Sequence, residues 1–269
     1  MSEILIGTSG YYYQDWLGNF YPEDMRKENF LDYYSSRFPF CELNFSYYQM
    51  PKRSNLIKLA RQTPQGFQFT VKAHQSITHG RGRDWERQAE DFFHALTPLS
   101  DEGKLSAVLL QFPYSFHYQP ANRKYLSDVL SVLDGLPLCI EFRNREWMKE
   151  SVYGGLEKRK VCFVQTDLPA LDNLPIPTST TTSNLGYVRF HGRNNENWWT
   201  GDNTSRFDYL YDDHELHSWL CRIEDIASKV SRLLIAFNNH HKGKAVRNAQ
   251  QFYRMITEHT DLKPEQLEL

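Results

Sequence analysis

Eight short apolar runs recur along the chain, and residues with a helical pattern separate most of them. The runs are Ile4–Ile6, Cys41–Phe45, Phe67–Val71, Ser106–Phe112, Leu138–Phe142, Val161–Gln165, Gly186–Phe190 and Leu233–Phe237. Short runs rich in β-branched and aromatic residues are typical of buried strands. Strands that alternate with helices indicate βαβ units and a parallel sheet, and eight units are the number needed to close a (β/α)8 barrel. We therefore predict an α/β fold that is a TIM-type barrel.

Helical periodicity is present in most of the segments between these runs. The predicted helices are Asn29–Arg37, Ser54–Gln62, Trp85–Leu96, Asn122–Leu133, Glu146–Lys158, His214–Val230 and Ala245–Thr257. The clearest is His214–Val230, where apolar residues recur every three or four positions on one face. The connection Thr166–Asn184 carries three prolines and a Ser/Thr run, so we predict an irregular loop in place of the helix between strands six and seven. Nothing resembles an interdomain linker, and we expect residues 1–269 to form one domain.

Composition excludes several classes of protein. The 31 Lys and Arg residues against 33 Asp and Glu residues give a formal net charge of −2, which argues against a broadly basic nucleic-acid-binding surface. Cys41, Cys139, Cys162 and Cys221 form no CxxC pair, so we expect reduced thiols rather than a zinc ribbon or a disulfide framework. No apolar run approaches the roughly 20 residues of a membrane span, and the first residues show no signal-peptide pattern. We expect a cytoplasmic protein without membrane contact.

Polar residues gather near the C-terminal ends of the predicted strands, often two positions apart. Strand side chains alternate between faces, and barrel active sites are built at the C-terminal strand ends, so we predict that these side chains point into the barrel there. The set comprises Glu42, Asn44, Ser46, Thr70, Lys72, His74, Gln111, Glu141, Arg143, Gln165, Asp167, Arg189, His191, Asn238 and His240. A structural ion-pair network is the alternative. Ionic groups on so many strands favour a functional cavity, since burying an unpaired ion costs several kcal/mol.

A family resemblance rests on motifs at successive predicted strand ends. The motifs are IGTSGYYYQDWLGNFYP, ELNFSYYQMP, FQFTVKAHQSITH, LLQFPYSF, IEFRNREW, YVRFHGRN and FNNHHKGKAVRNA. Together they resemble the YecE-like family, a domain of unknown function, over nearly the whole chain. The resemblance implies a TIM-type barrel. It implies no substrate, cofactor or mechanism, so the chemistry has to come from the residues themselves.

Cationic residues outnumber acidic ones at the predicted site, and aromatic residues crowd its loops. The planar guanidinium group of arginine can donate two hydrogen bonds to a phosphate, and rings beside arginines are typical of base or single-strand recognition. We therefore predict that the partner is a phosphate-bearing small molecule or a single-stranded nucleic acid. The predicted ligand-binding residues are Ser9, Tyr11, Asn44, Tyr47, Gln111, Arg143, Asp167, Arg189, Arg193, Asn238 and His240.

The acidic residues favour an enzyme over a simple binding module, because carboxylates in the site add little to anion binding but serve acid–base chemistry. We predict a hydrolase or lyase acting on a phosphate-bearing substrate, with Glu42, Lys72, Glu141 and His191 as catalytic candidates. A non-catalytic binding module and a glycosidase-like pair of Glu42 and Glu141 remain alternatives. No cofactor is predicted; a divalent metal stays open, although no HxH or HExxH spacing is present. The Trp198–Trp199 pair, expected to be exposed, fits either a subunit contact or a lid.

Overall fold

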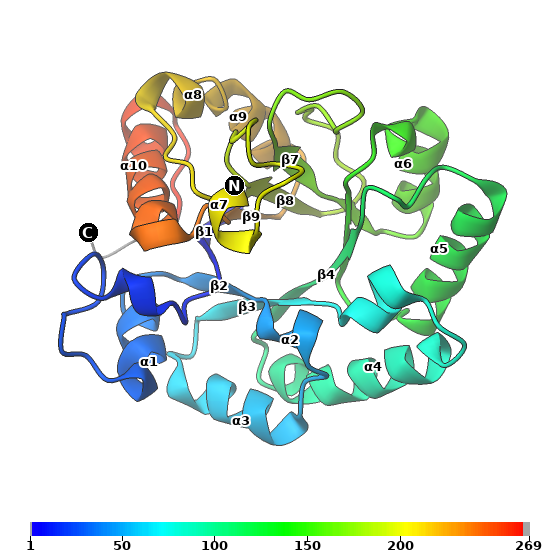
Figure 1. The fold of residues 1–269 in the computed structure, drawn as a ribbon, viewed down its shortest axis with the longest axis horizontal. Helices are drawn as coiled ribbons and strands as arrows, with labels where there is room; N and C mark the ends of the chain where they lie inside the picture. The colour runs from blue at the N-terminus through cyan, green and yellow to red at the C-terminus, as the bar shows by residue number, and fades with distance from the viewer. Residues whose placement is uncertain (1, 266–269) are drawn as a thin grey trace.

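The computed structural model describes residues 2–265, and its strands form one parallel sheet that curls into a barrel (Figure 1). The strands are β1 (Glu3–Ser9), β2 (Phe40–Leu43), β3 (Gln68–Lys72), β4 (Leu105–Phe112), β5 (Leu138–Phe142), β6 (Cys162–Phe163), β7 (Gln165–Asp167), β8 (Leu185–Phe190) and β9 (Arg232–Phe237). Consecutive strands pair in parallel from β1 to β6 and from β7 to β9, and β1 also pairs with β9. The chain therefore winds once around the barrel.

The sixth predicted strand is divided into β6 and β7. β6 pairs with β5, β7 pairs with β8, and the one residue between them, Val164, donates its backbone N–H to the Ile140 carbonyl oxygen at 2.9 Å. β6 and β7 are the two ends of the strand order, and they follow each other in the chain with only Val164 between them. The predicted α/β barrel is thus confirmed, and the count of nine strands instead of eight comes from this break.

Seven helices surround the sheet (Figure 1): α1 (Phe30–Ser35), α3 (Arg53–Gln62), α4 (Trp85–Asp101), α5 (Pro120–Val132), α6 (Glu150–Lys158), α9 (Leu220–Ala227) and α10 (Lys244–His259). The predicted helix His214–Val230 is divided into α8 (Asp213–His217) and α9. Residues 168–184 contain no helix, as predicted for this connection. None of the helices described between residues 2 and 265 is long and apolar enough to cross a membrane.

Two further short helices lie at the C-terminal ends of the strands. α2 (Phe45–Tyr48) follows β2 directly, and α7 (Asn203–Arg206) belongs to the long connection after β8. A single π-helical turn, Ser76–Gly80, follows β3. In Figure 1 both α2 and α7 lie in front of the barrel opening. These segments, which carried no clear periodicity, form part of the wall around that opening.

Alternation along the strands separates two apolar layers. The larger lies between the sheet and the helices and includes Val71, Leu110 and Ile235; the smaller fills the barrel with Leu5, Phe40, Ala107, Leu109, Cys139, Cys162, Val164, Tyr187, Leu234 and Ala236. Cys41, Cys139 and Cys162 are buried free thiols, and Cys221 is an exposed one. Every second side chain of a strand points into the barrel. Toward the C-terminal ends of the strands these inward positions are polar, as at Glu42, Glu141 and Arg189.

The inward orientation predicted for Asp167 is wrong. Cys162 and Val164 lie on the inner face, so alternation turns Asp167 outward toward the helices. There it accepts hydrogen bonds from the Tyr211 hydroxyl at 2.7 Å and the Trp219 indole N–H at 2.6 Å, and it pairs with Arg193 at 2.6 Å. The prediction placed Asp167 inside the barrel because the residue is polar. An odd number of positions separates it from the inward-facing Val164, so its side chain points outward.

The close approach of β1 and β2 gives a stability prediction. Gly7 lies opposite Phe40, and a Cβ atom at Gly7 would overlap the Phe40 carbonyl oxygen. We expect Gly7→Ala to lower the thermal unfolding midpoint by several degrees, because overpacking costs about 1–3 kcal/mol and each kcal/mol is worth about 2–4 °C in a chain of this size. Gly66→Ala, whose new Cβ has no neighbour within 4 Å, is the matched control. Equal midpoints for the two variants would contradict this packing.

Candidate functional site

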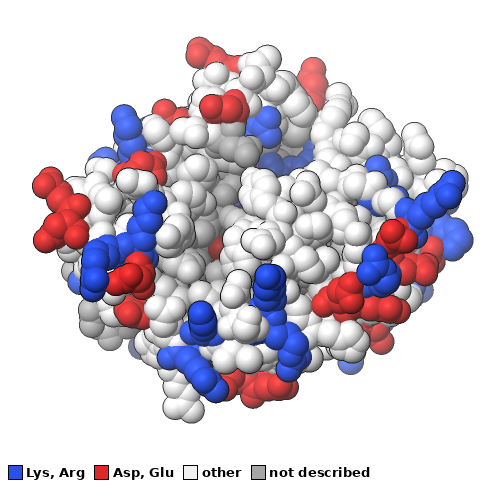
Figure 2. Space-filling view, turned by 60° about the horizontal axis from the view of Figure 1, so that its bottom comes forward, with Lys and Arg blue, Asp and Glu red and all other residues white. Residues whose placement is uncertain are grey.

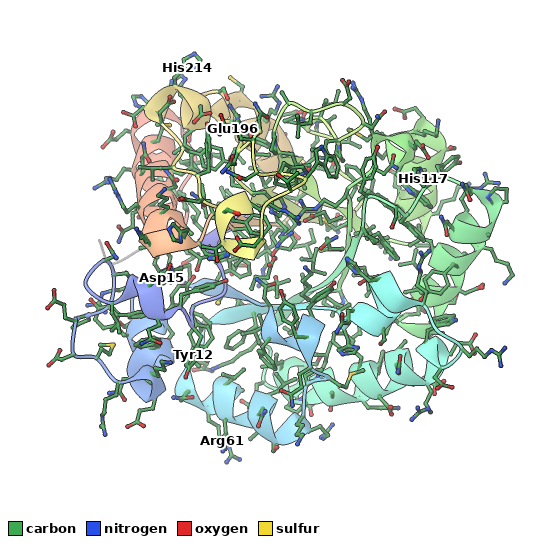
Figure 3. All side chains as sticks on the ribbon, in the orientation of Figure 1. Tyr12, Asp15, Arg61, His117, Glu196 and His214 are labelled. Carbon is green, nitrogen blue, oxygen red and sulfur yellow. The ribbon has the colours of Figure 1, made fainter. Side chains whose placement is uncertain are left out.

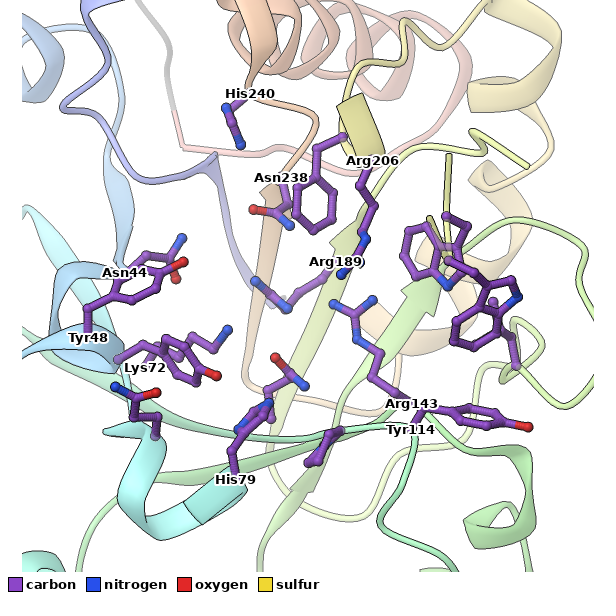
Figure 4. Close-up of a pocket in the computed structure, with 18 of the residues that line it drawn as sticks. Asn44, Tyr48, Lys72, His79, Tyr114, Arg143, Arg189, Arg206, Asn238 and His240 are labelled. Atoms are coloured by element: carbon purple, nitrogen blue, oxygen red, sulfur yellow. The ribbon is translucent and has the colours of Figure 1, made fainter. Parts of the chain in front are cut away.

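A cavity of about 640 Å³ opens at the C-terminal ends of the strands (Figure 4). Eight of the predicted site residues line it: Asn44, Tyr47, Lys72, Gln111, Arg143, Arg189, Asn238 and His240. They come from strands or strand ends around the barrel, so the convergence expected from alternation is present. The volume lies in the range of roughly 300–1,000 Å³ that is common for small-molecule sites.

Arg189 lies at the floor of the cavity between two fully buried carboxylates. Its Nε and Nη2 donate to the carboxylate of Glu42 at 2.8 and 2.6 Å, and its Nη1 donates to Oε2 of Glu141. The Tyr187 hydroxyl also donates to Glu42. Glu42 and Glu141 are both 0% exposed and are absent from the cavity wall. The two acids therefore hold the arginine rather than face a ligand.

The charges of this network fix one another. Burial alone would raise the pKa of Glu141, but Arg143 and Arg189 hold the pKa well below its usual range. Burial alone would lower the pKa of Arg189, but Glu141 and Glu42 outweigh it and raise the pKa. Both carboxylates are fully buried, and both are paired with a guanidinium group. This satisfies the requirement that buried charges be neutralised locally.

Arg143 and His191 extend the network to one side of the cavity. Arg143 Nε lies 2.5 Å from Oε1 of Glu141, and its Nη2 lies 3.2 Å from Nε2 of His191. Burial and then the nearby Arg143 lower the pKa of His191 well below its usual value, so the ring is neutral. The side-chain amide nitrogen of Asn238 lies 3.0 Å from Nδ1 of His191, and Arg189 Nη1 lies 3.3 Å from its Nε2. His191 is therefore a neutral orienting group behind the cavity wall.

Two cations reach the cavity without a carboxylate partner among the described residues: Lys72 at the end of β3 and Arg206 in α7. Nζ of Lys72 lies 4.4 Å from the centre of the Tyr47 ring. Burial, followed by the charge of Arg189, lowers the pKa of Lys72 to about 8. Arg206 Nη2 donates to the Gly201 carbonyl oxygen at 3.4 Å, while its buried Nε has no hydrogen-bond partner within residues 2–265.

The cavity is therefore positive. Lys72, Arg143, Arg189 and Arg206 all line it, and none of the described lining residues is Asp or Glu. Figure 4 shows these four side chains directed toward a common space from different elements. In the space-filling view of Figure 2, basic side chains are visible in a hollow in the upper part of this face, with acidic as well as uncharged residues around it. Glu42 and Glu141 balance Arg143 and Arg189 from behind the wall, so Lys72 and Arg206 supply its excess positive charge, whereas the chain as a whole carries a slight negative charge.

Several predicted residues lie elsewhere. Ser9 lies beneath the cavity, with its hydroxyl 3.4 Å from Arg189 Nη2. Tyr11 is not part of the wall and packs near Tyr34, and Arg193 pairs with Asp167 and Glu215 on the outer side of the sheet. Of the Trp198–Trp199 pair expected to be exposed, Trp199 is 50% exposed, whereas Trp198 is only 4% exposed, which corrects the expectation for that residue.

Eleven of the described lining residues were not predicted as site residues, among them the polar residues Gln75, His79, Tyr114 and Arg206. His79 lies in the π-helical turn, and burial and then Lys72 lower its pKa to about 4. Strand alternation favoured His74, whose ring instead lies 2.8 Å from the Ser76 hydroxyl. Arg206 lies well beyond the end of β8, where no periodicity could have placed it at the site.

Metal-ligand side chains do not converge in the described part of the chain. Within residues 2–265 no three His, Cys, Asp or Glu side chains are grouped so that they could hold a metal ion. Glu42 and Glu141 contact Arg189, and the His240 ring stacks on Tyr13 with ring centres 4.5 Å apart. Figure 3 shows other acidic and histidine side chains, such as Asp15, His117 and Glu196, on separate segments of the chain.

The buried ion pairs predict a stability effect with a defined pH dependence. We expect Glu141→Gln to lower the free energy of unfolding by about 3–5 kcal/mol at pH 7, because Arg143 and Arg189 lose a buried counter-charge. The folded-state pKa of Glu141 is depressed, so its contribution is present above the unfolded pKa of about 4.3 and is lost as the pH falls through the folded pKa. The difference between wild type and variant should therefore narrow in acid.

Urea unfolding at pH 7 and pH 3 measures this difference. Glu90→Gln, an exposed position in α4, is the control and should leave the free energy of unfolding almost unchanged at both pH values. A deficit of Glu141→Gln that is the same at both pH values would show that the ion pairs are not its source.

Comparison with known proteins places the chain in a family. The family described as "Protein of unknown function DUF72" matches residues 5–268. The UPF0759 protein YunF of Bacillus subtilis is 32% identical over 99% of each chain. The crystal structure of a DUF72 family protein from Thermotoga maritima is 36% identical, with a TM-score of 0.88 over 95% of this chain and 99% of that one. A DUF72 family protein from Enterococcus faecalis is 26% identical, with a TM-score of 0.84 over 98% of this chain and 100% of that one.

These relatives agree with the observations on fold and motifs. The solved structures match the barrel over nearly its whole length. The YecE-like family, which the strand-end motifs resemble, is this same family. The chain belongs to the DUF72 family, whose function is unknown.

Proposed function

We propose that the protein binds a phosphate-bearing small molecule in the cavity and acts on it as a lyase or hydrolase. The observation that carries the proposal is the cavity wall, which has four cationic side chains and no acidic one among its described residues. Phosphate groups are dianions at neutral pH and accept several charge-assisted hydrogen bonds from such a wall. A volume of about 640 Å³ suits a sugar phosphate or a nucleotide better than a long nucleic-acid strand.

The four cations differ in what they can offer a ligand. Arg189 uses its N–H groups mainly on Glu42 and Glu141, so it contributes charge rather than free donors. Arg143 is bound to Glu141 through Nε and is 12% exposed toward the cavity. Arg206 has a buried Nε without a partner within the described chain. Arg143 and Arg206 are therefore the proposed phosphate-binding pair.

Lys72 is the proposed proton-transfer group. Its pKa of about 8, lowered by burial and by Arg189, leaves an appreciable neutral fraction near neutral pH, and a general base works best when its pKa is close to the working pH. Hydrolysis would need a base beside an attacking water, and a carboxylate is a common choice for it. Glu42 and Glu141 are held below the wall by Arg189, which also weakens the glycosidase-like alternative. Proton abstraction by Lys72 therefore favours a lyase.

A non-catalytic binding module is the second candidate. The specific observation in its favour is that both buried carboxylates pair with arginines, so the acidic residues that pointed to an enzyme serve the structure of the wall. Phosphate binding is common to both candidates. Turnover of a bound compound separates them.

Thermal unfolding with added ligands tests phosphate binding. We expect sugar phosphates or nucleotides to raise the unfolding midpoint by several degrees, since a ligand at 100 times its Kd adds about 2.7 kcal/mol, whereas the matching neutral sugars and nucleosides should not. Arg143→Ala and Arg206→Ala should each weaken binding at least tenfold. Arg145→Ala, an exposed neighbour outside the wall, is the control.

Two outcomes would overturn the proposal. One is that no phosphate-bearing compound stabilises the wild type while neutral sugars do. The other is that Arg145→Ala weakens phosphate binding as much as Arg206→Ala. Arg206 forms no ion pair among the described residues, so its variant reports on binding even if Arg143→Ala disturbs the buried network. Single-stranded oligonucleotides in the same panel test nucleic acid as the partner.

A further inference from the structure

We propose that Lys72 forms an imine with a carbonyl group of the ligand, so that the substrate class is aldehyde or ketone phosphates. This inference rests on the proposed function, because the phosphate-binding pair has to bring the carbonyl group to the lysine. It goes further by giving Lys72 a covalent role and by naming a second functional group of the substrate.

The position of Lys72 is the first support. It ends β3 on the inner face of the barrel and reaches the cavity, where Figure 4 shows it opposite Arg189 and near His79. Its Nζ contacts the face of the Tyr47 ring, 4.4 Å from the ring centre, and forms no direct ion pair or side-chain hydrogen bond with the residues described between 2 and 265. An ammonium group has three N–H donors to satisfy, and a site without acceptors favours the neutral amine. Only the neutral amine is a nucleophile.

A second buried lysine in the same fold makes the contrast clear. Lys104, just before β4 at the other end of the barrel, donates from Nζ to the carbonyl oxygens of Ala60 and Thr63 at 2.6 and 2.7 Å and to the Thr63 hydroxyl at 3.0 Å. Three acceptors hold an ammonium group in a fixed structural role. Lys72 instead has the Tyr47 ring against its Nζ, and burial and the charges of Arg189 and Arg143 outweigh those of Glu42 and Glu141 in lowering its pKa. The two lysines therefore differ in reactivity for a reason that lies in their surroundings.

The chemistry balances without an oxidant or a reductant. The amine lone pair of Lys72 forms a C–N bond to the carbonyl carbon, and the carbonyl oxygen leaves as water with the two amine protons. The resulting imine, once protonated, withdraws electrons from the neighbouring carbon, so that its C–H bond can break. The electron pair then forms an enamine, and the proton passes to solvent, because the nitrogen of Lys72 is no longer available as a base. This is the covalent form of the lyase chemistry proposed above.

The charge state of Lys72 agrees with this role. Burial and the charge of Arg189 lower its pKa to about 8, so about half of the amine is neutral at pH 8. An exposed lysine with a pKa of about 10.4 is less than about 1% neutral at that pH. The imine should therefore form on Lys72 in preference to surface lysines, with a rate that rises between pH 7 and pH 9 and then levels off.

Reductive trapping tests the inference. The protein is incubated with glyceraldehyde 3-phosphate, dihydroxyacetone phosphate or ribose 5-phosphate and sodium cyanoborohydride, which reduces an imine to a stable amine, and the adduct is located by peptide mass spectrometry. We expect at least one of these compounds to label Lys72 at least tenfold more than any other lysine. Excess inorganic phosphate should suppress the labelling, and glyceraldehyde without phosphate should label Lys72 at least tenfold less.

Two variants serve as controls. Lys72→Arg keeps the positive charge but cannot form an imine, and it should lose the adduct while it retains the wild-type unfolding midpoint. Lys124→Arg removes an exposed lysine of α5 and should leave the adduct unchanged. The inference is overturned if labelling is spread evenly over the lysines, if it persists at the same level in Lys72→Arg, or if none of the three compounds gives an adduct.

Thermal shifts recorded with the same compounds without cyanoborohydride separate this inference from the proposed function. A stabilised protein without an adduct removes the imine and keeps phosphate binding. If neither these compounds nor any other phosphate-bearing compound of the panel stabilises the protein, and no adduct forms, both proposals fail together.

Discussion

The buried ion pairs of Arg189 are the constraint on which the rest of the site depends. Arg189 in β8 binds Glu42 in β2 and Glu141 in β5, so one guanidinium group connects three strands across the inside of the barrel. An unpaired ion in this position would cost several kcal/mol, and the arrangement is stable only because each charge finds its counter-charge. Glu42 and Glu141 both serve as counter-charges to Arg189. Because these acids and their arginines balance one another, the excess positive charge of the cavity above them comes from Lys72 and Arg206.

This network also divides the charged groups into fixed and adjustable ones. Glu141 is held ionised by its arginines, although burial opposes it, and His191 is held neutral by burial and by Arg143. Lys72 differs, since the shift in its pKa brings it to about 8, close to neutral pH. The ion pairs of Arg189 keep their charges while Lys72 gains or loses a proton. Such an arrangement suits chemistry on an anion, because the groups that bind the anion stay charged when the amine changes its protonation state.

The sequence predicted the barrel better than it predicted the site, for physical reasons. Strand and helix periodicity depends on burial along a single segment, and β5 matched its predicted bounds to the residue. Asp167 was misplaced because its orientation depends on the position of Val164 in the inner layer. Arg206 and His79 were missed because they lie on a short helix and a π-helical turn that come to the cavity through tertiary packing. Alternation finds residues on strands; it carries no information about loops that fold back over the barrel.

The two ends of the barrel differ in how their polar side chains are paired. The difference helps to decide whether the polar interior is a functional cavity or a structural ion-pair network. Near the start of the strands, Lys104 has three acceptors, and Arg232 pairs with Glu3 at 2.6 Å and donates to the Ser106 hydroxyl at 3.0 Å. These groups satisfy one another, as expected of residues that stabilise the fold. At the C-terminal end, Lys72 Nζ contacts the Tyr47 ring and forms no ion pair with a described residue, and the buried Arg206 Nε donates no hydrogen bond within the described chain. Native proteins seldom leave donors unsatisfied where only stability matters, so this asymmetry favours a ligand, and specifically an anionic one, as the missing partner.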